Sequence, residues 1–265
     1  MGRIFLNSLP KAGTNLLSRA LDLANFEYGK LGVAETLLIG DYYHARQLLR
    51  RSFFERDPLV VGLLVQAPVR RAWLDRKLGA ICDGGYVTGH ANASAGLLAL
   101  LSRHNYTVLQ MIRDPKDVLL SYVHYVAGEP RHYLHDAYKV QSLENRIRTT
   151  LRGGRICGLD VPPFSTMLRR VQAWIDMPNT TVVRFEDLVG PKGGGSDDCQ
   201  AAAFDQLSRV TGVRFTPSEI APKLFGKSST FRKGRIGMAE EELCEYTLQE
   251  VDQELGGFRE AWGYA

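Results

Sequence analysis

Long hydrophobic runs and signs of export are both missing from this sequence of 265 residues. No stretch approaches the roughly 18 uncharged apolar residues that a membrane-spanning helix needs. The chain enters Arg3-Ile4-Phe5-Leu6 without the basic segment, long apolar segment and cleavage site of a signal peptide. We therefore expect a soluble cytoplasmic protein with no membrane span.

Cysteine is scarce and charge is nearly balanced. The four cysteines, Cys82, Cys157, Cys199 and Cys244, lie far apart and form no CxxC pair, so we expect neither a structural zinc site nor a disulfide framework. The formal net charge of +4 is too small to indicate a nucleic-acid partner, although it fits an anionic small ligand. Hydrophobic residues at 45% and charged residues at 23% exclude a disordered or collagen-like chain.

Strand and helix patterns alternate along the chain. Apolar runs at 4–6, 107–112 and 180–185 predict buried strands, and helical spacing of apolar residues follows each of the first two. A last helix is predicted over 240–255. This alternation predicts an α/β fold, a single domain over residues 1–265 whose central parallel sheet is flanked by helices. We expect ligands beyond the carboxyl ends of the strands, and an irregular segment at 128–163 that serves as a lid or substrate-binding insertion.

The octapeptide SLPKAGTN, residues 8–15, joins the first predicted strand to the first helix. Backbone N–H groups at a helix N-terminus bind anions, Gly13 permits close approach, and Lys11 adds a positive charge. A Walker A loop places its lysine after the second glycine and follows it with Ser or Thr for magnesium. Here Lys11 precedes Gly13 and no GK[ST] occurs, which disfavours a metal-dependent kinase or NTPase.

This loop resembles the 5′-phosphosulfate loop of the sulfotransferases that use 3′-phosphoadenosine 5′-phosphosulfate (PAPS), whose pattern is [ST]-x-P-K-[SA]-G-[TN]-[TN]. The resemblance implies a P-loop-like nucleotide-binding fold and PAPS as co-substrate, with no metal. It also implies that the loop and the start of the helix contact the co-substrate through Lys11, Ala12, Gly13, Thr14, Asn15 and Leu16. Many members that act on phenols and steroids carry a tryptophan at the position of Leu16, so we expect Phe185 to contact the adenine instead.

Two further motifs occur in the order found in that family. Residues 111–125 resemble the 3′-phosphate-binding stretch R-[DN]-P-x-D-x-x-x-S, which implies phosphate contacts from Arg113 and Ser121. Arg113 follows a strand, where a guanidinium can bind a phosphate through two hydrogen bonds. Residues 231–238 resemble the R-K-G element, which implies further contacts from Arg232, Lys233 and Gly234. The stretch 182–188 and the ending at 262–264 also match the family, whereas 25–80 and 128–165 match weakly.

Sulfuryl transfer to a hydroxyl needs a base for the acceptor proton and a cation near the departing phosphate. The family carries its catalytic histidine after [TK]-[GT], between the two nucleotide motifs, and Thr88-Gly89-His90 fits that pattern. We therefore expect His90 to act as the base and Lys11 as the cation. His124 is the alternative base, and His132 and His135 are expected near the acceptor.

The resemblance implies transfer of a sulfuryl group from PAPS to a hydroxyl of a small-molecule, glycolipid or sugar acceptor. A P-loop-like nucleotide kinase or NTPase and a non-catalytic nucleotide-binding protein are the alternatives. The acceptor and the oligomeric state stay open, because the aromatic and arginine residues of 25–80 suit several partners.

Overall fold

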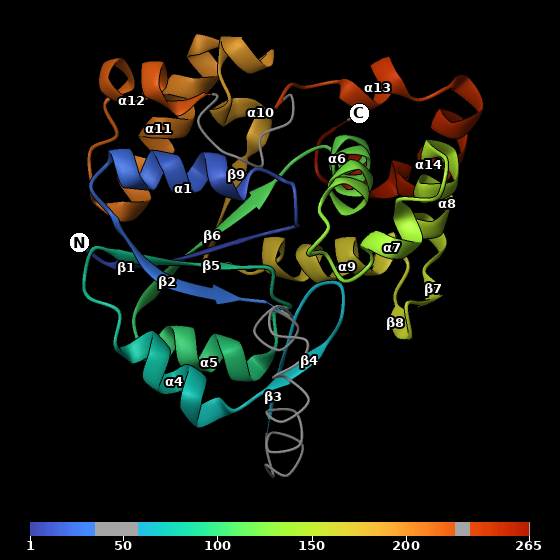
Figure 1. Cartoon of the computed structure of the whole chain (residues 1–265). Coiled ribbons are helices and arrows are strands. Elements are labelled where there is room, and N and C mark those ends of the chain that lie inside the picture. Colours follow the sequence, from blue (N-terminus) through green and yellow to red (C-terminus); the bar gives the residue numbers. More distant parts are fainter. Residues whose placement is uncertain (35–57, 226–233, 265) are drawn as a thin grey trace.

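The computed structural model describes residues 1–34, 58–225 and 234–264. Its centre is a five-stranded sheet in the order β2-β5-β1-β6-β9, and every neighbouring pair of strands is parallel (Figure 1). The strands are β1 (Arg3–Ser8), β2 (Glu27–Val33), β5 (Gly85–Gly89), β6 (Tyr106–Ile112) and β9 (Thr180–Arg184). The predicted α/β fold with a central parallel sheet flanked by helices is therefore confirmed.

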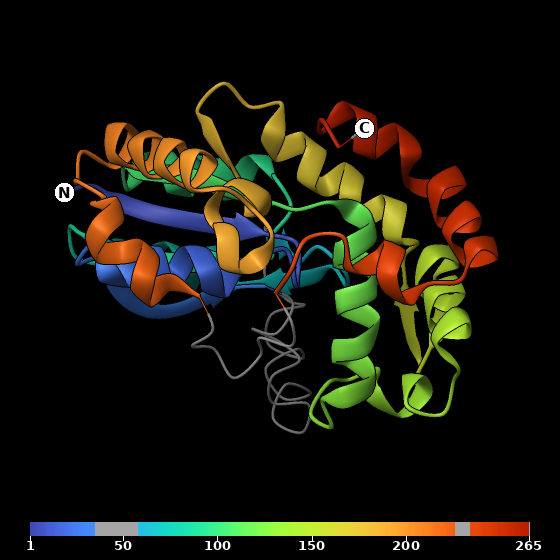
Figure 2. The same cartoon turned by 90° about the horizontal axis from the view of Figure 1, so that it is seen from above.

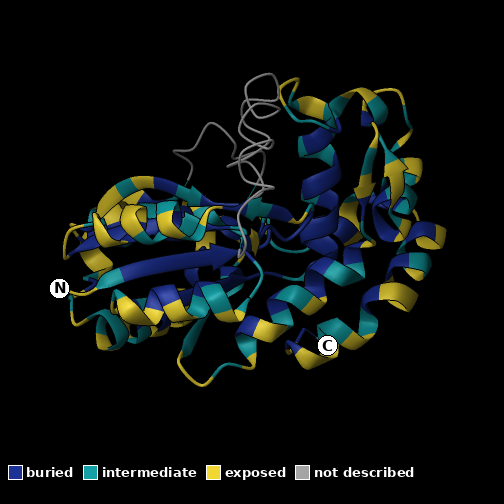
Figure 3. Ribbon diagram, turned by 90° about the horizontal axis from the view of Figure 1, so that it is seen from below, coloured by how far each residue is buried: buried dark blue, intermediate teal, exposed yellow. Residues whose placement is uncertain are grey.

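Alternating side chains of the strands bury both faces of the sheet. In β1, Ile4 and Leu6 belong to one hydrophobic cluster and Phe5 belongs to another, as the two-residue period of a strand requires. Figure 3 shows these strands enclosed between layers of helices whose outer surfaces are exposed. The near-continuous apolar runs in the sequence follow from this position.

Helices from separate parts of the chain cover each face (Figure 1). One face packs against α1 (Thr14–Leu23), α10 (Phe185–Leu188), α11 (Asp197–Thr211) and α12 (Pro217–Leu224), with the short 3₁₀ helix η1 (Pro191–Gly193) between α10 and α11. The other packs against α4 (Arg71–Gly79), α5 (Ala95–Arg103), the end of α9 (Phe164–Ile175) and the hairpin β3 (Leu59–Val61)–β4 (Ala67–Val69).

A third group of elements lies beyond the carboxyl ends of the strands (Figure 2). It has its own hydrophobic cluster, centred on the largely buried helix α6. The group comprises α6 (Pro115–Gly128), α7 (His135–Tyr138), α8 (Leu143–Arg152), β7 (Gly154–Ile156), β8 (Leu159–Val161), α13 (Met238–Glu242) and α14 (Glu245–Ala261). Because α6 follows β6 directly, this group forms one wall at the edge of the sheet where a ligand is expected.

Two sequence expectations are corrected here. The segment 128–163 is not irregular, because it contains α7, α8 and the hairpin β7–β8. The helix predicted over 240–255 is broken, since Leu243 and Cys244 adopt extended backbone and Leu243 is buried in the core between α13 and α14.

All four cysteines are free and lie exposed at the surface. Within the described residues, no helix combines the length and the apolar character needed to cross a membrane.

Candidate active site

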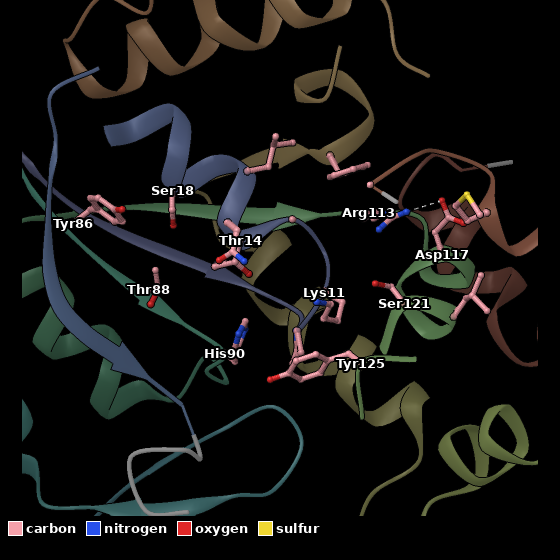
Figure 4. Close-up of a pocket in the computed structure, with 18 of the residues that line it drawn as sticks. Lys11, Thr14, Ser18, Tyr86, Thr88, His90, Arg113, Asp117, Ser121 and Tyr125 are labelled. Carbon is pink, nitrogen blue, oxygen red and sulfur yellow. Dashed lines mark hydrogen bonds and ion pairs between the residues drawn. The ribbon is translucent and has the colours of Figure 1, made fainter. Parts of the chain in front are cut away.

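A cavity of about 480 Å³ opens at the carboxyl ends of β1, β5 and β6 (Figure 4). Its lining brings together segments that are distant in the sequence: the loop from β1 to α1 with the first turns of α1, Tyr28 of β2, the end of β5, the first half of α6, Phe185 and Met238. Gly234, directly after the undescribed residues 226–233, also lines it. The sequence motifs therefore meet at one place, where parallel α/β sheets commonly bind ligands.

The loop between β1 and α1 is shaped by left-handed backbone at two residues. Gly13 caps α1 with a φ of 112°, and a Cβ there would lie 2.7 Å from Met111 Cε and 2.8 Å from Phe185 Cδ2. Only glycine fits this conformation and this packing. Lys11 has a φ of 71°, and its ammonium lies 4.5 Å from the centre of the Tyr125 ring in the cavity. The loop thus presents a cation beside the positive end of a helix dipole.

Burial, and then the charge of Arg113, lower the pKa of Lys11 from its ordinary value. Two cations therefore lie near each other in a partly desolvated space. Binding an anion there relieves their mutual repulsion, which is the electrostatic condition for phosphate or phosphosulfate binding.

Not every residue of the loop motif contributes a cavity-lining side chain. Thr14, Asn15 and Leu16 line the cavity as expected. Ala12 does not, because its side chain is fully buried in the core and its N–H donates to the carbonyl of Leu9 at 3.1 Å. Ala12 therefore stabilises the turn, and its contact with the co-substrate stays a prediction.

His90 is placed at the cavity by the pairing of two neighbouring strands. Asn7 of β1 lies opposite Gly89 of β5, so His90 follows directly beside Ser8. Its Nδ1 lies 2.8 Å from the carbonyl oxygen of Ser8, and a carbonyl can only accept. Nδ1 is therefore the protonated nitrogen, which leaves Nε2 with a free lone pair. Burial, and to a lesser degree the charge of Lys11, lower the pKa of His90, so the imidazole is neutral at pH 7.

A buried polar network holds this strand end in place, and sequence reasoning did not find it. Asn7 Nδ2 donates to Gln110 Oε1 at 2.8 Å and to the carbonyl of Ala91 at 3.1 Å, while Asn7 Oδ1 accepts from Ala91 N–H at 2.9 Å. Trp174 Nε1 donates to the same carbonyl at 2.7 Å. The available signal was a polar residue inside each of two apolar strands, Asn7 in β1 and Gln110 in β6, since buried amides need partners.

The other candidate histidines do not line the cavity. His124 Nε2 lies 3.0 Å from Glu242 Oε2, which pairs α6 with α13. His132 stacks on Tyr133 with 4.4 Å between ring centres, and burial lowers its pKa to about 4. His135 Nδ1 bonds to the carbonyl of Val126 at 3.2 Å. Of the four histidines considered as site residues, His90 alone lies where it can meet a ligand in this cavity.

Arg113 is buried at the end of β6 and is held from several directions. Its guanidinium lies 4.4 Å from the centre of the Phe185 ring and donates to Asp117 Oδ2 at 3.2 Å and to the carbonyl of Arg235 at 2.7 Å. Its Nε is buried and has no hydrogen-bond partner among the described residues. The Nε–H donor of this fixed arginine is thus left without a partner in the described part of the chain, and a bound anion could accept from it. Ser121, two turns further along α6, lines the same cavity.

Asp117 has a structural role at the start of α6. Its carboxylate accepts N–H bonds from Gly237 at 3.0 Å and Ala239 at 2.9 Å, besides its ion pair with Arg113. The residues that follow the R-K-G element are therefore tied to the helix that carries Ser121. Arg232 and Lys233 themselves lie outside the described residues.

Phe185 was expected to contact the adenine, and in the structure its ring mainly contacts other residues of the site. The ring is nearly buried, since Arg113 covers one face and Gly13 approaches its edge. Phe185 therefore supports both the phosphate-type loop and the arginine.

The end of the chain braces this part of the site. Glu186 accepts from the backbone N–H of Asp114 at 3.0 Å and from the hydroxyl of Tyr264 at 2.7 Å. Arg259 pairs with Asp114 at 3.1 Å, and Arg184 donates to the carbonyls that precede Tyr264. The matching stretches 182–188 and 262–264 thus meet behind β6 and fix the segment that carries the cavity arginine.

Solved structures of PAP-bound proteins share this fold. Mouse sulfotransferase SULT7A1, complexed with adenosine 3′,5′-bisphosphate (PAP), is 13% identical with a TM-score of 0.63 and covers 97% of this chain and 84% of its own. Retinol dehydratase in complex with retinol and PAP is 14% identical with a TM-score of 0.55, over 97% of this chain and 81% of its own. The same enzyme with androsterone and PAP gives a TM-score of 0.50 at 14% identity, over 97% and 80%.

No family model matches the chain, and no curated protein is significantly similar to it in sequence. The resemblance found in the motifs is confirmed at the level of the fold: the chain has the fold of the PAP-binding sulfotransferase structures.

Proposed function

We propose that this chain is a single sulfotransferase domain that transfers a sulfuryl group from PAPS to a hydroxyl. The products are a sulfate ester and PAP. The observation that carries the proposal is the meeting of Lys11, His90 and Arg113 in one cavity. In a shared fold, function depends on such a site, and each of the three side chains has a separate task in this reaction.

His90 supplies the base. The acceptor oxygen attacks sulfur and forms the new S–O bond, while the bond from sulfur to the bridging phosphate oxygen breaks. The acceptor proton passes to Nε2 of His90, whose Nδ1–H is fixed on the carbonyl of Ser8. A neutral imidazole held in one tautomer is suited to this transfer.

Lys11 and the first turn of α1 address the leaving group. Negative charge grows on the departing phosphate, and an ammonium already present in a partly desolvated cavity stabilises that charge without reorganising. Arg113 and Ser121 lie farther along the cavity, where the proposal places the 3′-phosphate. Arg232 and Lys233 complete that phosphate site in the proposal on the strength of the sequence motif alone.

The alternative reading as a kinase or NTPase is not favoured by the comparisons, and the loop has no hydroxyl at the magnesium-binding position. The non-catalytic alternative would keep the nucleotide site without a base, whereas His90 supports catalysis. A cytoplasmic location and a sugar, glycolipid or other small-molecule acceptor stay predictions.

Transfer of labelled sulfate from PAPS to a panel of sugars, phenols and lipids tests the proposal, with and without EDTA. We expect a labelled sulfate ester in amounts that EDTA does not change. Absence of any labelled product, or a strict need for magnesium with ATP as the donor, would contradict it.

A further inference from the structure

The cavity continues past His90, away from the proposed nucleotide site. Figure 4 shows Arg113 and Ser121 at one end, Tyr86, Ser18 and Thr88 at the other, and Thr14, Lys11 and His90 between them. We call the end lined by Ser18, Tyr28, Tyr86 and Thr88 the distal end. If the sulfuryl group lies at Lys11, an acceptor attacking from the side of His90 extends into this distal end. The inference below therefore rests on the proposed function.

The distal end is built by strand pairing. Tyr86, Thr88 and His90 alternate along β5, so their side chains leave the same face of the sheet. Tyr28 of the edge strand β2 is the registered partner of Tyr86, and the two ring centres are 5.3 Å apart. Gly32 is the partner of Thr88, and a Cβ there would lie 3.7 Å from Thr88 Oγ1. Tyr86, Thr88 and His90 thus lie next to β2. Gly32, the residue of β2 that pairs with Thr88, has no side chain to fill the space beside them.

The two tyrosines of the distal end differ in freedom. Tyr86 is 2% exposed, and its hydroxyl donates to Asp22 Oδ1 of α1 at 2.7 Å. Its side chain is therefore held in one position at the bottom of the distal end. Tyr28 is 40% exposed and contacts Tyr86 through its ring. Tyr28 therefore presents an aromatic surface that a ligand can cover.

The chemistry of this end selects among acceptors. Its four lining side chains all carry hydroxyls, and none of them is charged. The nearby Asp22 carboxylate accepts from Tyr86, which disfavours an anionic acceptor on this side. A long apolar chain would cover the Thr88 hydroxyl without offering it a polar partner, which costs binding energy. A sugar-like ring with several hydroxyls suits both the aromatic surface and the hydroxyl groups of this end. Its C–H face can cover the ring of Tyr28, and its hydroxyls can bond to Ser18 and Thr88.

We propose that the acceptor is an uncharged sugar residue, bound between Tyr28 and Thr88 with one hydroxyl directed at Nε2 of His90. The sugar can be free or can be the head of a glycolipid, because both present the same ring.

Two variants and one matched control test this proposal with PAPS as donor. Tyr28→Ala removes the aromatic surface, and Thr88→Val replaces the hydroxyl by a methyl of similar shape. The control is Tyr246→Ala, since Tyr246 is 63% exposed on α14 and lies outside the cavity. The acceptors are methyl glycosides of the common hexoses, galactosylceramide, p-nitrophenol and retinol, and PAP affinity is measured for each variant by calorimetry.

We expect sulfation of at least one methyl glycoside, with KM for that sugar raised about tenfold or more in Tyr28→Ala and raised in Thr88→Val. PAP affinity should be unchanged in all three variants, and Tyr246→Ala should behave as the unaltered protein. Activity on galactosylceramide but on none of the methyl glycosides would identify the acceptor as the head group of a glycolipid. Activity on the methyl glycosides equal to that on galactosylceramide would identify it as a free sugar.

Sulfation of p-nitrophenol or retinol but of neither sugar source would overturn the sugar assignment and leave the proposed function standing. An unchanged sugar KM in Tyr28→Ala and Thr88→Val would overturn the assigned place. Failure to bind PAP and to sulfate any acceptor would instead contradict the proposed function itself.

Discussion

The two ends of the cavity are built in contrasting ways. At the end of Arg113, the guanidinium is tied to Asp117 and to the carbonyl of Arg235, and the C-terminal residues brace the strand behind it. At the distal end, Tyr28 comes from an edge strand and is 40% exposed. The first end is lined by residues of two motifs that resemble those of a family, whereas Ser18, Tyr28 and Tyr86 of the distal end belong to no such motif. The difference is what we expect when a co-substrate is common to a family and the acceptor is particular to one chain.

The largest effect should come from the residue between the two ends. His90→Ala removes the proposed base, and we expect turnover to fall by roughly 10²–10⁴ while PAP affinity is retained, because in the proposal the base faces the acceptor. Steady-state kinetics with calorimetry of PAP binding checks both parts. If His124→Ala is inactive and His90→Ala is not, the base is misassigned although the sulfotransferase proposal stands.

The pH dependence of turnover tests the assignment of His90 as the base in a second way. Neutral His90 is the active form, and burial followed by the charge of Lys11 lowers its pKa from the ordinary value. Activity should therefore hold at neutral pH and fall as the pH drops through a pKa below about 6.5. The acidic limb should vanish in the residual activity of His90→Ala, and an unchanged limb in that variant would assign it to another group.

Lys11→Ala should affect catalysis and nucleotide binding together. We expect turnover to fall roughly 10²-fold and PAPS to bind more weakly, because in the proposed mechanism the ammonium contacts the phosphosulfate in the ground state and this interaction strengthens as charge develops. Single-turnover rates and PAPS titration measure the two losses separately. A loss of binding alone would remove Lys11 from the chemical step.

A smaller effect should come from a histidine outside the cavity. The pKa of His132 is about 4 in the folded protein and about 6.5 when unfolded, so the unfolded chain binds its proton first as the pH falls. This histidine should therefore cost about 1–3 kcal/mol of stability between pH 6.5 and pH 4. Urea unfolding of the unaltered chain and of His132→Asn should show converging stabilities on acidification, and parallel curves would contradict this assignment.

Local signals in the sequence were enough to predict which residues lie together in the half of the cavity that we propose binds the co-substrate. The strand before the loop, Gly13 at a position with a φ of 112° and the helix after it are neighbours in the chain, so their pattern could be read directly. The same holds for Arg113 and Ser121, which one strand and one helix place together.

Contacts between distant segments were not accessible in this way. The bond from Asn7 to Gln110 spans 103 residues, and the pairing of Tyr28 with Tyr86 depends on a glycine-containing edge strand with no clear alternation. The break between α13 and α14 arises because Leu243 turns into the core, a tertiary effect that helical periodicity does not encode. Ala12 was assigned to the ligand because its motif position was known and its burial was not.

The central claim is that the end of the cavity at Arg113 recognises a 3′-phosphate, and calorimetry of PAP against AMP tests it most directly. The unaltered chain should bind PAP at least tenfold more tightly than AMP, since each charge-assisted contact contributes about 1.5–3 kcal/mol. Arg113→Ala should weaken PAP binding by a similar factor and leave AMP binding nearly unchanged. Equal affinity of the unaltered chain for PAP and AMP would contradict the account.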